Sequence, residues 1–249
     1  MQHVFRICCA VALAWLACAG LAQAGWQQGT YQANGKPVTE YHCAPKSKQK
    51  APAVVLLHGA GPEGQDNAAD ERLCEDLAAH GYFAEFIEYY SQTGAVEPRQ
   101  MEPVRKNFPA WMIEIGFGLE GLRNNPAVEP NRIALLGFSL GANLALAFAA
   151  LRPDEVQAVV EYYGWLPRKL QSRAGSMPPV LIVHGKQDEI VPVNFATDLD
   201  GLLTKNQRPH EIKIYDDAGH GFNFQSPPTK DTKDAWEHTL TFLHKYLKQ

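Results

Sequence analysis

Short apolar runs alternate with stretches of helical spacing along most of the chain. The runs at 53–57, 133–138 and 180–185 are rich in valine, isoleucine and leucine. Runs of this length without polar alternation are typical of strands buried on both faces of a parallel sheet. Three further strands are predicted at 82–90, 156–163 and 210–215. Helical spacing predicts helices at 67–80, 110–124, 140–150, 193–204 and 234–247.

Strands that alternate with helices predict an α/β protein, with a mostly parallel central sheet and helices on both of its faces. Two stretches depart from this rhythm. Residues 25–50 are polar and rich in turn formers, with possible edge strands at 30–38 and 40–43. Residues 91–109 are interrupted by a glycine and by prolines, which predicts a long loop or a small insertion, and no large cap domain.

The first residues have the parts of a Sec-type signal peptide. Arg6 supplies positive charge, residues 7–21 are apolar, and 22–24 read Ala-Gln-Ala, a cleavage signal. The apolar part is short for a membrane span, so an uncleaved anchor is the weaker alternative, as is a lipoprotein modified at Cys18. We expect cleavage after residue 24 and a single mature domain, 25–249, in the periplasm or outside the cell, without membrane attachment.

Composition limits the partners and cofactors of this domain. The chain has 23 lysine and arginine residues against 27 acidic ones and no basic run, which argues against nucleic-acid binding. No metal-site spacing of histidines or cysteines occurs, and the glycines near residue 60 lack the rest of a dinucleotide fingerprint, so we expect neither metal nor cofactor. Cys43 and Cys74, the cysteines beyond the predicted signal, either form a disulfide or remain two buried thiols.

One strand-to-helix junction carries a G-x-S-x-G pattern, in which Gly137 and Gly141 flank Ser139. This pattern is typical of a nucleophile elbow, a tight turn that holds a serine in strained backbone geometry. Glycines on either side avoid collisions in the crowded turn. The serine hydroxyl would then lie over the start of the next helix, where the N–H of Leu140 can stabilise negative charge.

Two further reactive groups follow later strands, Asp188 and then His220. In such sheets the ligand site lies at the carboxyl ends of the strands. A serine hydroxyl needs a base within hydrogen-bond reach, which His220 would supply. Asp188 would fix the imidazole tautomer and stabilise the imidazolium, and its neighbour Glu189 is the alternative acid. The order Ser, Asp, His is the one expected of the α/β-hydrolase fold.

An oxyanion hole needs a second N–H donor beside that of Leu140. The loop after the strand at 53–57 begins His58-Gly-Ala-Gly and resembles an HG-type oxyanion motif, which places Ala60 N–H as the second donor. His58 is expected to pack beside this loop; its alternative role is a second base. His184 precedes a turn glycine and is expected to hydrogen-bond locally.

At these residues the chain resembles the α/β-hydrolase superfamily and, within it, the dienelactone hydrolase family. The resemblance runs from about residue 53 to the end and includes the blocks at 185–192 and 218–222. Two departures matter. The family's namesake enzymes use a cysteine nucleophile, where this chain has Ser139, and they carry a glutamate at the position that Gly59 occupies here. The resemblance therefore implies ordinary serine-esterase chemistry without the thiol activation of the namesakes.

The sequence predicts an exported, cofactor-free serine hydrolase that cleaves small carboxylic esters or lactones. Alternatives are a serine peptidase or an acyltransferase on the same fold, and a catalytically silent binding protein. A monomer and a homodimer both remain open. Several strand-end aromatic residues and two loop arginines would line the substrate pocket, the alternatives being rim packing and solvation. These are Tyr89, Tyr90, Tyr163, Trp165, Arg99 and Arg105.

Overall fold

The computed structural model describes residues 25–61, 67–95 and 101–248, which contain an eight-stranded sheet of order β1-β2-β4-β3-β5-β6-β7-β8. The strands are β1 (Gln27–Ala33), β2 (Lys36–Cys43), β3 (Ala51–Leu57), β4 (Phe83–Ile87), β5 (Val128–Phe138), β6 (Ala158–Tyr162), β7 (Val180–Gly185) and β8 (His210–Tyr215). Neighbours from β4 to β8 pair in parallel, whereas β1 and β2 are antiparallel. The predicted mostly parallel sheet is confirmed.

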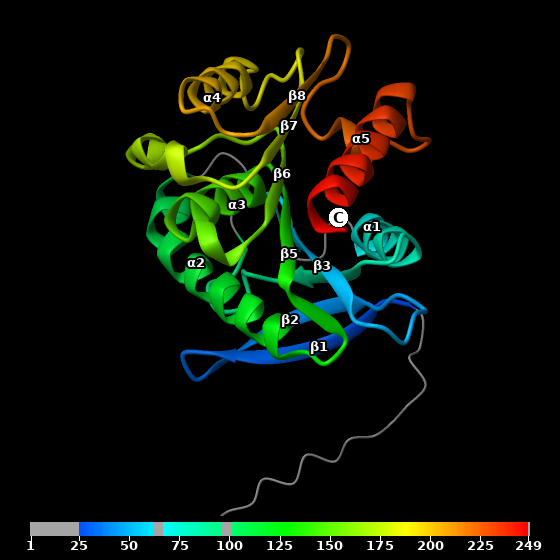
Figure 1. Ribbon diagram of the computed structural model, residues 1–249. Helices are drawn as coiled ribbons and strands as arrows, with labels where there is room; N and C mark the ends of the chain where they lie inside the picture. Colours follow the sequence, from blue (N-terminus) through cyan, green and yellow to red (C-terminus); the bar gives the residue numbers. More distant parts are fainter. Residues whose placement is uncertain (1–24, 62–66, 96–100, 249) are drawn as a thin grey trace, which may run out of the picture.

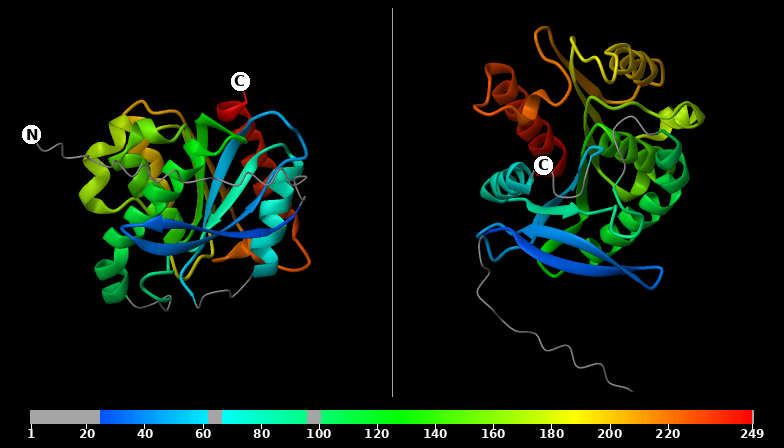
Figure 2. Two further views of the ribbon diagram at one scale, coloured as in Figure 1. Left: turned by 90° about the horizontal axis from the view of Figure 1, so that it is seen from below. Right: turned by 180° about the vertical axis from the view of Figure 1, so that it is seen from behind.

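Helices cover both faces of this sheet, as predicted. They are α1 (Asn67–Ala79), α2 (Met101–Asn124), α3 (Leu140–Leu151), α4 (Asn194–Lys205) and α5 (Lys230–Leu247), with short 3-10 helices η1 (Pro153–Glu155), η2 (Arg168–Ser176) and η3 (Phe222–Phe224). Figure 1 and the view from behind in Figure 2 place α1 and α5 on one face and α2, α3 and α4 on the other. Two separate apolar clusters fill the two sides.

Burial explains why the central strands form. Every residue of β3 is buried, which matches a strand covered by helices on both faces. In β5 the buried residues gather toward the carboxyl end, immediately before Ser139. After α1, Gly81 adopts a positive φ of 83° and its N–H bonds back to the Ala78 carbonyl, which is the arrangement of a glycine C-cap.

The amino-terminal part was predicted wrongly as two strands at 30–38 and 40–43. The chain instead forms a long hairpin, β1 and β2, that turns at Asn34 and Gly35. Both turn residues have positive φ, 52° and 75°, as a tight two-residue hairpin turn requires. Asn-Gly is the most favourable pair for that geometry. The sequence therefore encodes the turn, but the predicted strand at 30–38 continued across it.

The predicted loop or insertion at 91–109 is also partly wrong. Residues 101–109 form the first turns of α2, and residues 96–100 lie outside the described part of the chain. Pro109 sits inside the helix, where it removes one backbone hydrogen bond. Val104 and Phe108 pack against the apolar cluster on this face, and that burial stabilises turns which local propensity disfavours.

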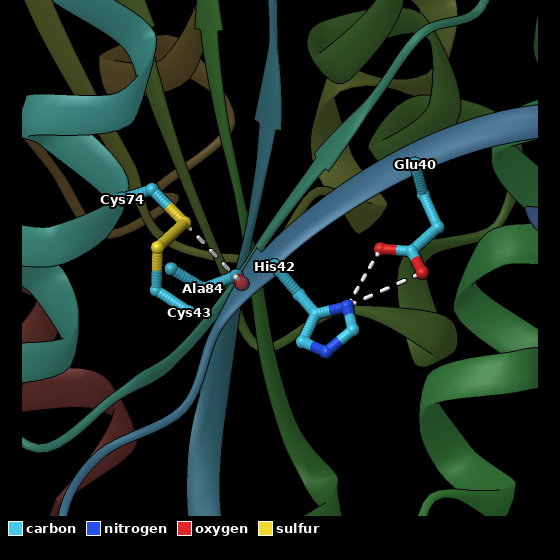
Figure 3. The surroundings of a disulfide bond; sticks show 5 residues. All are labelled: Glu40, His42, Cys43, Cys74 and Ala84. Carbon is cyan, nitrogen blue, oxygen red and sulfur yellow. Dashed lines mark hydrogen bonds and ion pairs between the residues drawn. A yellow bond between two sulfur atoms is a disulfide. The ribbon is translucent and has the colours of Figure 1, made fainter. Parts of the chain in front are cut away.

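Cys43 and Cys74 form a disulfide that joins β2 to α1, with a Cα–Cα distance of 5.7 Å. Of the two possibilities left open by the sequence, the structure has the pairing. Figure 3 shows the disulfide on the side of α1, while His42 and Glu40 point to the other side of β2. Adjacent strand residues point to opposite faces, which explains the split. Along the described ranges, no helix is both long and apolar enough to span a bilayer.

Candidate active site

Ser139 lies in the turn between β5 and α3, in backbone geometry that few residues adopt. Its φ and ψ are 53° and −113°, which costs about 1–3 kcal/mol of strain for a residue with a side chain. A side chain at position 137 would overlap the backbone of Gly141, and one at 141 would overlap the carbonyl of Leu57. Glycine is therefore required at both positions, and the predicted elbow geometry is present.

A chain of hydrogen bonds connects three side chains that lie far apart in the sequence. The Ser139 Oγ is 3.1 Å from His220 Nε2, and His220 Nδ1 is 2.7 Å from Asp188 Oδ2. Because a carboxylate only accepts, Nδ1 carries the proton and Nε2 is left to accept from the serine hydroxyl. The arrangement is the one in which a histidine can withdraw a proton from serine.

Asp188 is held as a carboxylate although it is buried. Burial alone would raise its pKa, but the hydrogen bond from His220 and the backbone N–H groups of Val191 and Ile190 outweigh burial and hold the pKa below its usual value. Glu189, the alternative acid, is exposed. His184 bonds through Nε2 to the Val191 carbonyl at 2.8 Å, in line with the predicted local hydrogen bond, and burial lowers its pKa, which favours the neutral ring.

Residues at the end of β6 and directly after it contact both Ser139 and His220. The Ser139 N–H donates to the Tyr162 carbonyl at 2.9 Å. The ring of Tyr163 packs over His220 with centroids 4.5 Å apart, and its hydroxyl bonds to Asn223. Tyr163 has a positive φ of 45°, an unusual conformation that points to a constrained turn.

The same turn is tied to the elbow helix by buried polar groups. Glu161 is fully buried and accepts from the Gly164 N–H at 2.8 Å, and burial raises its pKa to about 8. Asn143, one turn into α3, accepts from the Trp165 N–H at 2.7 Å. Tyr163 was predicted only as a pocket residue, and Glu161, Asn143 and Asn223 were not predicted at all, since these contacts join distant segments.

The loop after β3 lies beside the elbow. A Cβ placed on Gly59 would be 3.5 Å from the Cβ of Ser139. Ala60, the predicted oxyanion donor, follows in this loop and is half-buried. Leu140 is the first residue of α3, and the first N–H groups of a helix have no partner within it. Both predicted donors therefore belong to segments that border Ser139.

The predicted pocket residues fall in different environments. Tyr89 and Tyr90 have no exposed surface, which favours the alternative that they are packing residues over the prediction that they line the substrate pocket. Arg105 is exposed on α2, and Arg99 lies outside the described residues. Trp165 is half-buried, meets the Phe195 ring in a tilted contact with centroids 5.6 Å apart, and lines a cavity of about 440 Å³ between η2 and α4. A second cavity of about 740 Å³ lies between α1 and α5 and reaches Phe138, next to Ser139. In the described ranges, no three metal-ligating side chains come together.

The sheet order, the helices on both faces and a serine at a strand-to-helix turn define the class as an α/β hydrolase. The family model described as the dienelactone hydrolase family matches residues 38–247. The chain therefore belongs to the dienelactone hydrolase family, and it is a hydrolase of that family.

Individual relatives agree with this assignment. A candidate carboxymethylenebutenolidase of Aquifex aeolicus is 26% identical over 239 residues, which cover 89% of this chain and 99% of the relative. A carboxymethylenebutenolidase of Rhodococcus opacus is 29% identical over 133 residues, 48% of this chain and 52% of the relative. The crystal structure of a candidate dienelactone hydrolase of Klebsiella pneumoniae superposes with a TM-score of 0.76 at 21% identity, covering 89% of this chain and 99% of that one, which supports the fold.

Proposed function

We propose that this protein is a serine hydrolase that cleaves small carboxylic esters or lactones through an acyl-enzyme intermediate. The observation that carries the proposal is the chain from Ser139 Oγ to His220 at 3.1 Å and on to Asp188 at 2.7 Å. Distances of this size allow proton transfer without rearrangement of the side chains. Ser139 is half-buried, so part of its surface is accessible at the carboxyl edge of the sheet, where substrates of such folds bind.

In the acylation step Ser139 Oγ attacks the carbonyl carbon of the ester while its proton passes to His220 Nε2. The carbonyl oxygen becomes an oxyanion, which the N–H groups of Leu140 and Ala60 stabilise. Asp188 stabilises the imidazolium that forms and keeps Nδ1 protonated. Collapse of the tetrahedral intermediate breaks the bond to the leaving oxygen, which takes the proton from His220 Nε2 and departs as an alcohol.

Deacylation repeats these steps with water. His220 Nε2 accepts a proton from the water as its oxygen attacks the acyl carbon, and the same two N–H groups hold the second oxyanion. When the bond to Ser139 Oγ breaks, the serine regains its proton from the imidazolium and the carboxylic acid leaves. With a lactone substrate the ring opens in the acylation step, and the alcohol stays attached to the acyl group until deacylation releases the hydroxy acid.

The substrate class is supported by the family. Carboxymethylenebutenolide, which gives two of the relatives their names, is an unsaturated lactone. The nucleophile here is a serine, so we expect a broader range of simple esters as well. The disulfide between Cys43 and Cys74 favours an oxidising compartment, which supports export to the periplasm or beyond by the segment at 1–24.

The test is hydrolysis of p-nitrophenyl acetate and of a small unsaturated lactone by the wild-type protein and Ser139→Ala. We expect the substitution to lower kcat by at least about 10⁴-fold on both substrates, since removal of the nucleophile leaves only binding and oxyanion stabilisation. The matched control is Ser176→Ala, at the surface end of η2, which should retain the full rate. Full turnover by Ser139→Ala would refute the proposal.

A further inference from the structure

We propose that His58 is a positioning residue for the oxyanion hole: its ring fixes the peptide unit between Gly59 and Ala60 so that the Ala60 N–H faces the reacting carbonyl. This inference rests on the proposed function, because it assigns a role within that reaction. It follows from what the two ring nitrogens of His58 contact and from the rigidity of a peptide bond.

The first contact sets the direction of a carbonyl group. His58 Nδ1 lies 2.7 Å from the Gly59 carbonyl oxygen. A carbonyl only accepts, so Nδ1 must carry the proton and donate it. The hydrogen bond is short and joins adjacent residues. A freely rotating side chain would not keep such a bond, so other contacts must fix the ring.

The peptide bond transmits that direction to the next residue. The atoms of a peptide unit lie close to one plane, and in the trans form its C=O and N–H point in opposite directions. Because the Gly59 carbonyl points toward the His58 ring, the Ala60 N–H of the same peptide unit points in the opposite direction, away from that ring. A rotated peptide would present a carbonyl oxygen there instead and would repel an oxyanion. Gly59 itself borders the serine, 3.5 Å from its Cβ to a Cβ built on the glycine.

Two contacts hold the His58 ring in place and a third holds its backbone. Glu88 Oε1, from the segment after β4, lies 3.0 Å from His58 Nε2. The two atoms approach closely, without the alignment of a hydrogen bond. The Tyr89 ring stacks on the imidazole with centroids 4.0 Å apart and planes 3° apart. The Tyr89 hydroxyl also donates to the backbone carbonyl of His58 at 2.7 Å.

These contacts also exclude the alternative that His58 is a second base. Both of its nitrogens face oxygen atoms of Gly59 and Glu88, so no lone pair is directed at Ser139. The ring is thus a fixed donor next to the loop that carries Ala60, and its chemistry differs from that of His220.

A matched pair of substitutions separates the donor from the rest of the side chain. In His58→Asn the side-chain amide nitrogen can occupy the position of Nδ1 and still donate to the Gly59 carbonyl. In His58→Gln the amide reaches the position of Nε2, near Glu88, and leaves the carbonyl without its donor. The two variants have similar polarity, so a merely structural role would affect them alike.

We expect His58→Gln to lower kcat/KM for p-nitrophenyl acetate by about 10- to 100-fold, since removing one oxyanion donor altogether costs about 10²- to 10³-fold. His58→Asn should keep at least ten times the kcat/KM of His58→Gln. A trifluoromethyl ketone forms a tetrahedral oxyanion when Ser139 adds to it. Its affinity for His58→Gln should fall by the same factor. Melting temperatures of both variants, measured in parallel, identify losses that are due to unfolding.

Three results would overturn the inference: kcat/KM of His58→Gln within about twofold of the wild type, equal losses in both folded variants, or unchanged ketone affinity in His58→Gln. A measurement on the wild-type protein does not depend on how the variants fold. In histidine-labelled protein, nitrogen NMR should find a proton on His58 Nδ1 at neutral pH, and a bare Nδ1 would refute the mechanism. If Ser139→Ala is inactive while His58→Gln is fully active, this inference alone fails and the proposed function stands.

Discussion

Two histidine–carboxylate pairs lie on loops at the carboxyl edge of the sheet, and they differ in what the second ring nitrogen contacts. His220 has Asp188 at 2.7 Å on one nitrogen and the Ser139 hydroxyl at 3.1 Å on the other. His58 has Glu88 at 3.0 Å on one nitrogen and a backbone carbonyl at 2.7 Å on the other. A hydroxyl can give up a proton and a carbonyl cannot, so only His220 is placed to act as a base.

The aromatic neighbours of the two rings differ in the same sense. Tyr89 stacks flat on His58, at 3° between planes, whereas Tyr163 meets His220 at 55°. The flat stack covers a ring whose two nitrogens are both occupied. The tilted contact leaves the edge of His220 open toward Ser139. The contacts of His58 therefore favour a fixed ring, whereas those of His220 allow proton exchange with Ser139.

The largest expected contrast comes from removing each carboxylate. Asp188→Asn should lower kcat by about 10⁴-fold, because the amide favours the wrong imidazole tautomer and cannot stabilise the imidazolium. Glu88→Gln should lower kcat by no more than about tenfold, since it affects only the placement of one oxyanion donor. Steady-state kinetics on a p-nitrophenyl ester compare the two. Losses of similar size would erase the distinction between the pairs.

Another carboxyl, that of the fully buried Glu161, provides a pH test. Its folded-state pKa of about 8 lies above the usual value, so the folded protein holds a proton that the unfolded chain releases. Stability should therefore fall as pH rises from about 4.5 to 8, by about 1.4 kcal/mol per pH unit for this group. Glu161→Gln should remove that contribution and can still accept from the Gly164 N–H.

Urea denaturation at pH 5, 6, 7 and 8 measures this effect in both proteins. The difference in unfolding free energy, variant minus wild type, should increase across the series. Glu155→Gln is a suitable control, because its carboxyl is partly exposed in surface ion pairs with arginine side chains. A difference that stays constant with pH would mean that Glu161 is ionised in the folded protein.

The smallest effects are expected at the two tyrosine hydroxyls. Tyr163→Phe keeps the ring over His220 and loses only the bond to Asn223, so we expect kcat to fall by about two- to fivefold, the equivalent of roughly one neutral hydrogen bond or less. Tyr89→Phe loses the bond to the His58 carbonyl and should weaken trifluoromethyl ketone binding by a similar factor. If Tyr163→Phe lost a hundredfold or more, the hydroxyl would have a role in the reaction itself.

Most of the sheet and the hydrogen-bonded chain of Ser139, His220 and Asp188 could be predicted from local patterns. β3, β5 and β7 are continuous apolar runs, and Ser139, Asp188 and His220 each follow a strand in the order that the fold requires. Parallel strands bring their carboxyl ends to one edge, so position in the sequence was enough to bring the three together.

The missed features depend on contacts between distant segments. The start of α2 contradicts its own propensity at Pro109 and is stabilised by the burial of Val104 and Phe108. The contacts of Tyr163 and Glu88 join loops that follow different strands. No local pattern in the sequence indicates such contacts. The hairpin turn at Asn34 and Gly35 is different, because its signal was present and the predicted strand ran through it.

The central claim is that Ser139 is the group that attacks the substrate. The most direct measurement is mass spectrometry of the wild-type protein after reaction with a fluorophosphonate, which phosphonylates an activated serine. We expect one adduct per chain, on the peptide that contains Ser139, and none in Asp188→Asn on the same timescale. An unmodified Ser139 peptide, or an adduct on another residue, would contradict the account.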